Sequence, residues 1–521
     1  MTTVRSHTAV SMSHKLNVLD LERGGEISLT QQLVARIAAL IDSGELEPGS
    51  KLPATRALAA EAGINHLTAV RVYRRLAELG YVAAAVGRGT FVRRSAPFAA
   101  GAGSEAAGGA GARENDDWQH GLLAPRPVSY ADEMLRASLH TPHTSDAIPL
   151  ASGFPDPGLC PSAELAEIAA QIARDDPRAV TGYLEVEGLR ELRERLAELG
   201  CDAGYARGAG EILVTSGARQ GIDLVARALL GPGDVAVVES PTFAGTLASL
   251  QATGARVLPL PMDADGADIG ALERILARHE IKLVAIQASC QNPTGADLSP
   301  QRRERLLELA RTRGFFVLDD GVYATMRYEG DPLPRLRAQA PAHVIHVDSF
   351  SKTIGGGLRV GWLAASGPIF DRLVHLKMDS DIHTASLPQH LGARYLRGDR
   401  HERLLAEALP VYRLRRDALL RALERHLGHD ASWTVPRGGH HVWVTLHDPT
   451  DERALYSEAL RAGMTFLPGG ALQAEKSTRT TMRLSFGLAE PAEHDEALRR
   501  LALALREVRR RSGGSATGAL S

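Results

Sequence analysis

Apolar residues recur at helical intervals in the N-terminal part of the chain, residues 19–94. The first series is spaced by three and four positions and consists of Leu33, Ile37, Leu40 and Ile41. This spacing places the four side chains on one face of a helix, and Gly44 is expected to end it. Two further helices are predicted, one over residues 54–62 and one that Asn65 caps and that reaches Leu79.

A short turn that contains Gly63 separates the second and third predicted helices, which is the arrangement of a helix-turn-helix unit. After the third helix, residues 81–85 and 90–94 flank Val86-Gly-Arg-Gly89 and predict a small hairpin, a wing. Polar and basic residues of the third helix are suited to base edges and phosphates. An ordinary solvated helix face is the other interpretation of the same residues.

From about residue 118 to residue 510, short β-rich runs alternate with helical segments. The predicted strands are residues 211–215, 234–239, 256–260, 282–287, 315–319, 343–348 and 360–364. Most are separated by helices, such as residues 220–230 and 300–312. This alternation predicts an α/β domain with a mostly parallel sheet covered on both faces. Beyond residue 396 helices dominate again, which predicts a smaller second lobe.

Residues 95–117 separate the two predicted domains. They are mostly Ala and Gly without an apolar period, so they cannot bury enough surface to offset the entropy of ordering. A flexible coil of this length spans about 25 Å root-mean-square. We therefore expect a flexible tether between the domains 19–94 and 118–512, and disordered ends at residues 1–18 and 513–521.

Length, charge and cysteine content narrow the class of protein. A chain of 521 residues is too long for one hydrophobic core, so two or more domains are expected. Its net charge of −2 requires any DNA-binding surface to be local. Three cysteines are too few for a disulfide framework and fit a reducing compartment. No run approaches the roughly 18 apolar residues of a membrane span, and residues 1–20 lack the apolar core of a signal peptide. We expect a cytoplasmic protein without a metal site.

Lys352 lies in the segment Ser349-Phe-Ser-Lys-Thr-Ile-Gly-Gly-Gly-Leu-Arg-Val-Gly-Trp362. A nucleophilic lysine must be desolvated or held near other cations, so that its amine is neutral often enough to attack a carbonyl. The flanking hydroxyls, the glycines and Arg359 suit the phosphate of an aldehyde cofactor. Taken alone, such a segment is more often a surface lysine in a glycine-rich turn.

Further candidate residues follow the ends of predicted strands, where ligands gather in such sheets. They are the turn Ser216-Gly-Ala-Arg-Gln-Gly221, Phe243, Asn292, Asp320, Tyr323 and Arg483. A small-residue turn that opens a helix suits a phosphate, and an arginine suits a carboxylate. Each has an ordinary structural interpretation as a turn, core aromatic, cap or surface ion pair. Their common position around one lysine favours a binding site.

The segment Gly44-Glu-Leu-Glu-Pro-Gly-Ser-Lys-Leu-Pro-Ala-Thr-Arg-Ala-Leu-Ala59, with Gly87-Arg-Gly-Thr-Phe-Val92, closely resembles the winged-helix domain of GntR-type bacterial regulators. The resemblance implies DNA contacts by Arg56, His66, Thr68, Arg71, Gly87 and Arg88. The chain departs from the family at Asn65-His66, where Ser-Arg is common, and at Ala69, where a β-branched residue is common. The operator sequence therefore does not follow.

The C-terminal motifs, together with Gly153-Phe-Pro-Asp156 and Tyr183–Arg193, resemble the fold-type I class I/II aminotransferases over residues 146–508. The resemblance implies that Lys352 holds pyridoxal 5'-phosphate as an imine and that Asp320 pairs with the pyridine nitrogen. It also implies hydrogen bonds from Asn292 and Tyr323 to the ring hydroxyl. Phe243, where tyrosine is commoner, is expected to stack on the ring.

The same resemblance assigns the phosphate and the substrate. The implied phosphate ligands are Ser216, Gly217, Ala218, Ser351 and Arg359, with Tyr183 reaching the phosphate of the neighbouring subunit. Arg483 and Gly153 are implied to bind the substrate and its carboxylate. Gly356 stands where proline is frequent, which removes no required charge. A domain-swapped homodimer follows from the role of Tyr183.

A winged helix, a tether and an aminotransferase-like domain together resemble the MocR subfamily of GntR regulators over almost the whole chain. The resemblance implies a regulator that binds double-stranded DNA half-sites and senses an amino compound, or the cofactor itself. Two alternatives stay open. One is a working aminotransferase that carries a DNA-binding domain, and the other is an effector domain that never binds the cofactor.

Overall fold

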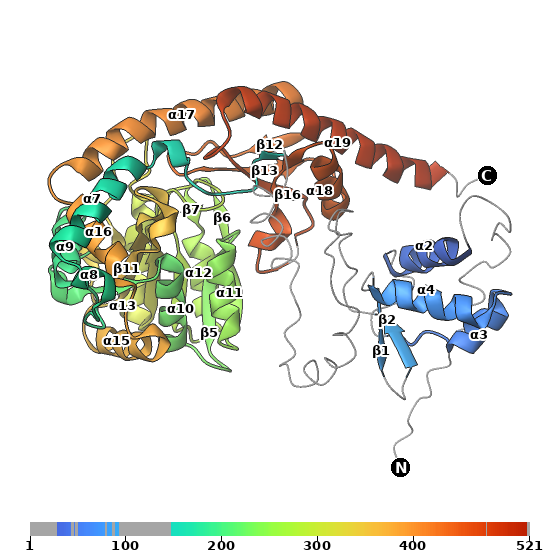
Figure 1. The fold of residues 1–521 in the computed structure, drawn as a ribbon, viewed down its shortest axis with the longest axis horizontal. Helices are drawn as coiled ribbons and strands as arrows, with labels where there is room; N and C mark the ends of the chain where they lie inside the picture. The colour runs from blue at the N-terminus through green and yellow to red at the C-terminus, as the bar shows by residue number, and fades with distance from the viewer. Residues whose placement is uncertain are drawn as a thin grey trace, which may run out of the picture. The chain divides into compact units, whose positions relative to one another are not determined.

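The computed structural model describes residues 29–42, 46, 50–78, 81–85, 89–92, 147–475 and 477–517. The described residues belong to two compact units, one N-terminal and one C-terminal (Figure 1). The expected tether, residues 1–18 and the boundaries at residues 19, 94 and 118 lie outside these ranges and stay predictions. Residues 513–517, which the sequence analysis places in a disordered end, instead form the end of helix α19 (Pro491–Thr517), and residues 518–521 lie outside the described ranges.

The N-terminal unit has the helix-turn-helix and wing that the sequence predicts. Its elements are α2 (Leu29–Asp42), α3 (Thr55–Glu61), α4 (His66–Glu78), β1 (Val82–Ala85) and β2 (Gly89–Val92). The two strands pair antiparallel, and Asn65 caps α4 because its Oδ1 accepts a hydrogen bond from the backbone N–H of Leu67 at 2.9 Å. Gly63 in the turn has φ +57°, a conformation that glycine adopts at little cost. The core includes Leu33, Ile37, Leu58, Val72 and Leu76.

The C-terminal unit is built on a mostly parallel sheet, as expected from the alternating pattern. Its strand order is β4-β11-β10-β9-β8-β5-β6-β7. The strands are β4 (Ile212–Thr215), β5 (Val235–Ser240), β6 (Arg256–Asp263), β7 (Gly266–Ala267), β8 (Leu283–Ile286), β9 (Phe316–Asp320), β10 (Val344–Ser349) and β11 (Gly361–Ala364). β11 runs antiparallel to both β4 and β10. Each predicted strand overlaps one of these elements, with ends that differ by a few residues, whereas the short β7 was not predicted.

Helices cover both faces of this sheet, so the strands are apolar on both sides. One face packs against α10 (Ala218–Leu229), α11 (Ala244–Ala252) and α15 (Pro368–Asp381). The other face packs against α12 (Ile269–Leu276), α13 (Pro300–Arg313) and α14 (Leu336–Gln339). Next to β4 and β11, the apolar cluster continues into α7 (Ser162–Asp175), α9 (Arg190–Ala203) and α16 (Ser386–Tyr395).

The remainder of the unit forms the smaller lobe. Its antiparallel sheet has the order β12-β13-β16-β15, with bounds Ala431–Trp433, His441–Leu446, Thr481–Ser485 and Leu467–Pro468. The long helices α17 (Arg400–Leu427) and α19 (Pro491–Thr517) pack together along the outer side of this sheet, and α18 (Glu452–Arg461) packs against α19 (Figure 1). β3 (Ile148–Pro149) joins the lobe by pairing with β14 (Met464–Thr465). The segment that enters the C-terminal unit is therefore anchored to the small lobe.

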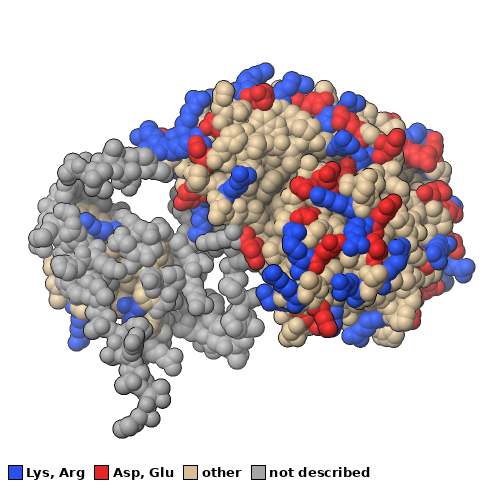
Figure 2. All heavy atoms as spheres, turned by 180° about the vertical axis from the view of Figure 1, so that it is seen from behind, with Lys and Arg blue, Asp and Glu red and all other residues tan. Residues whose placement is uncertain are grey.

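The surface charge is mixed. Figure 2 shows lysine and arginine side chains interspersed with aspartate and glutamate over the visible face of the C-terminal unit. Within the described parts of the chain, no helix has the length and apolar character needed to cross a membrane. Nor do the described residues contain a group of three His, Cys, Asp or Glu side chains arranged to hold a metal ion.

Candidate functional site

A cavity of about 420 Å³ lies where several strands of the large sheet end. It brings together residues that the sequence analysis singled out from distant segments: Gly153, Ala218, Phe243, Asn292, Asp320, Tyr323, Ser351, Lys352, Arg359 and Arg483. Gln287 lines the same cavity and was not predicted, and Arg219 lines it from within the predicted turn 216–221. Parallel strands bring their carboxyl ends to one edge, which explains why these residues meet.

Lys352 follows β10 in a short 3-10 turn, Phe350–Lys352, and its side chain lines the cavity. Its Nζ donates a hydrogen bond to the carbonyl oxygen of Gly153 at 2.8 Å. Burial lowers the pKa of this amine to about 8, and the nearby cations Arg483 and Arg359 act in the same direction. An amine with a pKa lowered in this way is a competent nucleophile near neutral pH.

Asp320 is the last residue of β9, and its carboxylate lines the cavity. Gln287 Nε2 donates to its Oδ2 at 2.7 Å, and the backbone N–H of Val322 donates to its Oδ1 at 3.2 Å. Burial raises the pKa of this carboxyl to about 6. Gln287 also orders the neighbouring turn, because its Oε1 accepts from the backbone N–H of Asn292 at 2.6 Å. Its position at the end of a predicted strand was the sequence signal that could have identified it.

The cradle for an anion lies between β4 and the start of α10. Gly217 has φ +87° there, and Arg359 Nη2 donates to the carbonyl oxygen of Ser216 at 3.1 Å. The positive φ favours glycine at this position, and a Cβ on Gly217 would lie only 2.7 Å from Arg359 Nη2, so that the guanidinium would have to shift. The free N–H groups at the start of α10 and the Arg359 guanidinium form a site for a phosphate.

Arg483 projects from β16 and is buried. Its Nη1 donates to Asn292 Oδ1 at 3.1 Å, and its Nη2 donates to the carbonyl oxygen of Ala151 at 2.6 Å. Burial lowers its pKa to about 10, at which the group remains a cation at neutral pH. Its Nε has no hydrogen-bond partner among the described residues, so the guanidinium retains capacity for a carboxylate.

One extended segment, residues 151–156, lies over both Lys352 and Arg483. The carbonyl oxygens of Ala151 and Gly153 accept the hydrogen bonds from Arg483 and Lys352. The far end of the segment is tied to α17, because Asp156 Oδ2 pairs with the buried Arg415 at 2.6 Å. We call residues 151–156 the strap. Main-chain carbonyls have no sequence signature, so the strap's contacts were not predicted.

Two adjacent histidines stand behind the cavity and were also missed. His441 Nε2 lies 2.9 Å from the hydroxyl of Tyr323, and the His440 ring packs edge-on against the same tyrosine at 5.5 Å between centroids. Both histidines are buried. Burial lowers the pKa of His440 to about 3 and that of His441 well below the usual value, so both imidazoles are neutral. The two histidines follow Gly438-Gly439 in the sequence, but no sequence pattern indicated that they lie near Lys352.

Tyr183 is the predicted site residue that this single chain does not bring to the cavity. It is 84% exposed and packs edge-on against His383 at 5.6 Å between centroids. Val180, Met378 and Ile382 are large apolar side chains that are also exposed, on or next to α8 (Arg178–Thr181) and α15. Ser386, the first residue of α16, links that helix to α8, because its Oγ donates to the carbonyl oxygen of Ala179 at 2.7 Å.

The predicted DNA-contacting residues have mixed positions in the N-terminal unit. Arg56 on α3 and His66 and Arg71 on α4 are exposed, whereas Thr68 is half-buried. Gly87 and Arg88 lie outside the described residues. Leu67 was not predicted, although it is 63% exposed in the first turn of α4.

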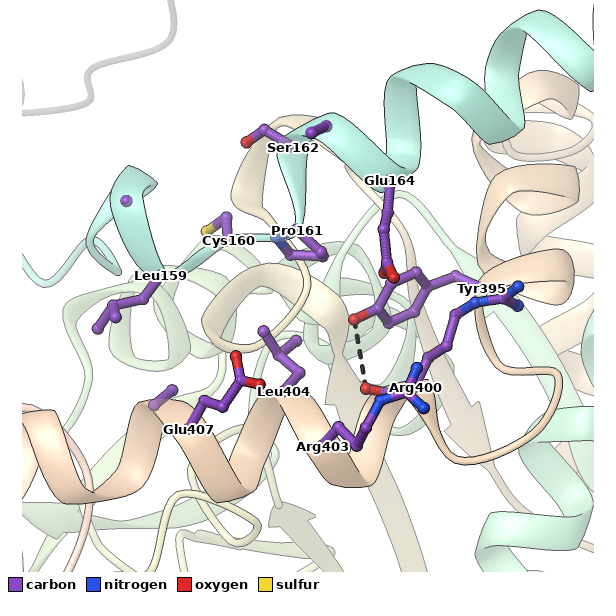
Figure 3. A pocket seen from close by; sticks show the side chains of 13 residues that line it. Leu159, Cys160, Pro161, Ser162, Glu164, Tyr395, Arg400, Arg403, Leu404 and Glu407 are labelled. Carbon is purple, nitrogen blue, oxygen red and sulfur yellow. Dashed lines mark hydrogen bonds between the residues drawn. The ribbon is translucent and has the colours of Figure 1, made fainter.

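A second hollow, of about 290 Å³, lies between the starts of α7 and α17 (Figure 3). Glu164, Glu407, Arg400 and Arg403 line it, and the hydroxyl of Tyr395 donates to the carbonyl oxygen of Arg400 at 3.5 Å. Its charges have mixed sign, and none of its lining residues belongs to the Lys352 cavity. It is therefore a surface hollow apart from the candidate site.

The cavity fits pyridoxal phosphate on its own chemistry. It offers an amine with a lowered pKa, a buried carboxylate, an aromatic ring and a phosphate cradle that an added Cβ would fill. Lys352 would hold the aldehyde carbon, Asp320 the pyridine nitrogen and Arg359 the phosphate. Asn292 and Tyr323 are placed for the ring hydroxyl.

The lowered pKa of Lys352 predicts how covalent capture of the aldehyde depends on pH. At pH 7 about one amine in ten is neutral if the pKa is about 8, against about one in several thousand for an ordinary lysine. We expect the capture rate of the cofactor-free protein to rise about tenfold per pH unit below pH 8 and then to level off. Stopped-flow absorbance after mixing with pyridoxal phosphate measures this. A rate that keeps rising through pH 10 would contradict it.

Comparison with known proteins gives two family matches. Residues 145–501 match the family described as aminotransferase class I and II, and residues 29–92 match the bacterial regulatory proteins of the gntR family. The HTH-type transcriptional regulator TauR of Rhodobacter capsulatus is 30% identical over 501 residues, which cover 93% of this chain and 98% of TauR. Its similarity therefore spans both units.

The C-terminal unit alone is similar to enzymes. The aromatic-amino-acid aminotransferase 1 of Thermococcus litoralis is 32% identical over 380 residues, covering 72% of this chain and 91% of the enzyme. The crystal structure of LysN, the α-aminoadipate aminotransferase of Thermus thermophilus, superimposes with a TM-score of 0.68 at 32% identity. It covers 72% of this chain and 95% of LysN, and it contains N-(5'-phosphopyridoxyl)-L-leucine.

Proposed function

The chain belongs to the class I and II aminotransferase family and, through its GntR-type domain, to the MocR subfamily of transcriptional regulators, and we propose that it senses an amino compound in the Lys352 cavity. The observation that carries the proposal is one chain that holds both the Lys352 cavity and a unit of the gntR family. The protein takes pyridoxal phosphate, as its family does. Free pyridoxal phosphate is the alternative effector.

When bound, pyridoxal phosphate supplies an aldehyde that reacts with amines and a ring that withdraws electrons. The protein's part is to hold and orient these groups. Lys352 presents a neutral amine, and Asp320 keeps a negative charge beside the pyridine nitrogen. Arg483 binds the carboxylate of the incoming amino compound, because its guanidinium is buried, cationic and within the same cavity.

The strap gives a physical route from the cavity to the small lobe. Its two carbonyl oxygens accept from Lys352 and Arg483, the groups that the cofactor and the effector carboxylate must engage. We propose that ligand binding breaks these two contacts and shifts the strap. Asp156 at the end of the strap pairs with Arg415 on α17, so the shift reaches the small lobe. The effect on DNA follows if the two arrangements bind the ligand with different affinity.

A homodimer completes the proposed sensor. Tyr183 and the exposed apolar side chains Val180, Met378 and Ile382 would be covered by a second copy. We propose a domain-swapped pair in which each Tyr183 reaches the phosphate of the partner's cavity, so that two winged helices meet two half-sites. The two domains would comprise residues 19–94 and 118–512, joined by a flexible tether. Such a regulator acts in the cytoplasm, where the DNA is.

The proposal predicts that an effector changes DNA affinity. We expect an amino acid or amino sulfonate that alters the visible absorbance of the cofactor-bound protein to change the Kd for DNA by about 5- to 150-fold. Fluorescence anisotropy with a fragment from upstream of the protein's own gene measures the change. If every amine that alters the absorbance leaves both affinity and footprint unchanged, the sensing proposal fails.

Aminotransferase activity is the second candidate, because the cavity contains an amine, carboxylate and arginine suited to it. Repeated conversion of an amino acid and a 2-oxo acid, measured over many turnovers, would establish it. A single half-reaction without turnover would instead agree with a sensor.

A further inference from the structure

Tyr323 and His441 form a buried hydrogen-bonded pair behind the cavity. The tyrosine hydroxyl lies 2.9 Å from His441 Nε2, and the side chains are 3% and 2% exposed. The rings meet edge-on, with centroids 5.3 Å apart. Tyr323 lines the cavity, whereas His441 stands outside the lining. The pair therefore joins a residue that touches the cofactor site to one that does not.

His441 is fixed in its place from two sides. It opens β13 opposite Ser485 of β16, so it is a diagonal neighbour of Arg483 on the same face of the small sheet. Gly153 of the strap lies against it, since a Cβ there would come within 2.8 Å of His441 Cε1. This packing leaves the imidazole little freedom to move away from the tyrosine.

The direction of the hydrogen bond follows from the rest of the ring. A neutral imidazole carries one N–H and one unprotonated nitrogen. His441 Nδ1 has no hydrogen-bond partner among the described residues. A proton on Nδ1 would be a buried donor without an acceptor, whereas a proton on Nε2 is used by the tyrosine oxygen. The tautomer with its proton on Nε2 leaves Nδ1 as an unpaired acceptor, which costs less than an unpaired donor.

With Nε2–H donating, the hydroxyl proton of Tyr323 has no protein acceptor among the described residues and is available to the cavity. We propose that His441 is a positioning residue that donates Nε2–H to Tyr323 and thereby commits the tyrosine proton to the ring hydroxyl oxygen of the bound cofactor. The proposal concerns the cofactor site itself and holds whether the protein is a sensor or an enzyme.

Several charged or titratable groups face this pair from other elements. They are Asp320 on β9, Lys352 after β10, Tyr412 on α17, His440 before β13 and Arg483 on β16. Burial raises the pKa of Tyr323 above its usual value, so its hydroxyl keeps its proton across the working range. The proton that the pair delivers is therefore shared in a hydrogen bond and is not released.

The expected result is an upward shift in a spectroscopic titration. A hydrogen bond donated to the ring oxygen favours its ionised form, so it lowers the pH at which the visible band of the bound cofactor titrates. His441→Phe keeps an aromatic ring but removes the donor, and the midpoint should rise by about half a pH unit to one pH unit. Absorbance of the full-length, cofactor-loaded protein measures it. An unchanged midpoint overturns the proposal.

The sign of the shift separates the two tautomers. If Tyr323 instead donates to His441, then His441→Phe frees the tyrosine proton for the cofactor, and the midpoint falls. That outcome overturns the proposal as well. His441→Gln places an amide N–H at similar reach and should bring the midpoint back toward that of the native protein. A glutamine variant that titrates as high as the phenylalanine variant counts against the donor role.

A double-variant cycle distinguishes positioning from general packing. Tyr323→Phe should raise the midpoint by itself, and adding His441→Phe to it should change nothing further, because the donor then has no hydroxyl to act on. A shift of the same size in both backgrounds would show that His441 acts through packing. His440→Phe is the matched control, since His440 is equally buried and packs on Tyr323 without a hydrogen bond to it.

Discussion

Replacement of Lys352 by alanine is expected to abolish covalent retention of pyridoxal phosphate. Lys352 is the lysine that lines the cavity, and desolvation of its half-buried side chain lowers the pKa of its amine to about 8. The groups expected at the phosphate, the pyridine nitrogen and the ring hydroxyl all remain in the variant. The cofactor should therefore still bind, but it should leave on dialysis, and the response of DNA binding to amines should be lost.

The measurement is the protein mass after borohydride reduction, combined with visible absorbance before and after dialysis. Lys377→Met is the matched control, because burial lowers the pKa of Lys377, as it does that of Lys352, and Lys377 is fully buried. It pairs with Asp381 at the end of α15 and does not line the cavity. A reduced adduct on the Lys352→Ala protein, or its loss from the Lys377→Met protein alone, would contradict the assignment.

The fold was predictable because its periodic patterns are local. The helix-turn-helix, the wing and the alternation of strands and helices along the C-terminal part of the chain follow from apolar spacing and turn residues. The place of β11 does not follow, since this strand inserts antiparallel between β4 and β10. β10 and β11 are neighbours in the sequence, but the pairing of β11 with β4 joins segments that are far apart in the sequence, which no local pattern records.

The candidate site was predictable where chemistry lies in side chains at strand ends. Asp320, Asn292 and Lys352 are of this kind, and the structure places all three in one cavity. The carbonyl oxygens of the strap were out of reach, because every residue has one. His441 was out of reach for another reason, since its contact with Tyr323 depends on the packing of the small lobe against the large sheet.

Removal of Arg71 and Arg56 is expected to weaken operator binding strongly. Both side chains are exposed, on α4 and α3, in the unit that matches the gntR family. If each arginine makes a contact worth about 1–3 kcal/mol, each alanine substitution raises the Kd by about 5- to 150-fold. Anisotropy titrations at several salt concentrations measure the loss.

The salt dependence tells the two kinds of contact apart. Removing an arginine that binds a phosphate lowers the affinity for all DNA sequences, and it reduces the slope of log K against log salt by about one. An arginine that reads a base relaxes the discrimination between the operator and a mutated site. Arg71 lies in the first half of α4, the recognition helix, whose N-terminal part contacts base edges in the major groove, whereas Arg56 lies on α3. We therefore expect Arg71 to affect discrimination more than Arg56 does.

Arg190→Ala is the control for the change in net charge. Its side chain is 79% exposed and pairs with Glu194 on α9, in the other unit. If the protein binds DNA through α3 and α4, this variant keeps the native Kd and the native salt slope. An equal loss in all three variants would mean that overall charge governs binding, and the helix-turn-helix would then have no specific part in it. Because the net charge of the chain is only −2, a loss confined to Arg56 and Arg71 would place the DNA-binding surface on the N-terminal unit.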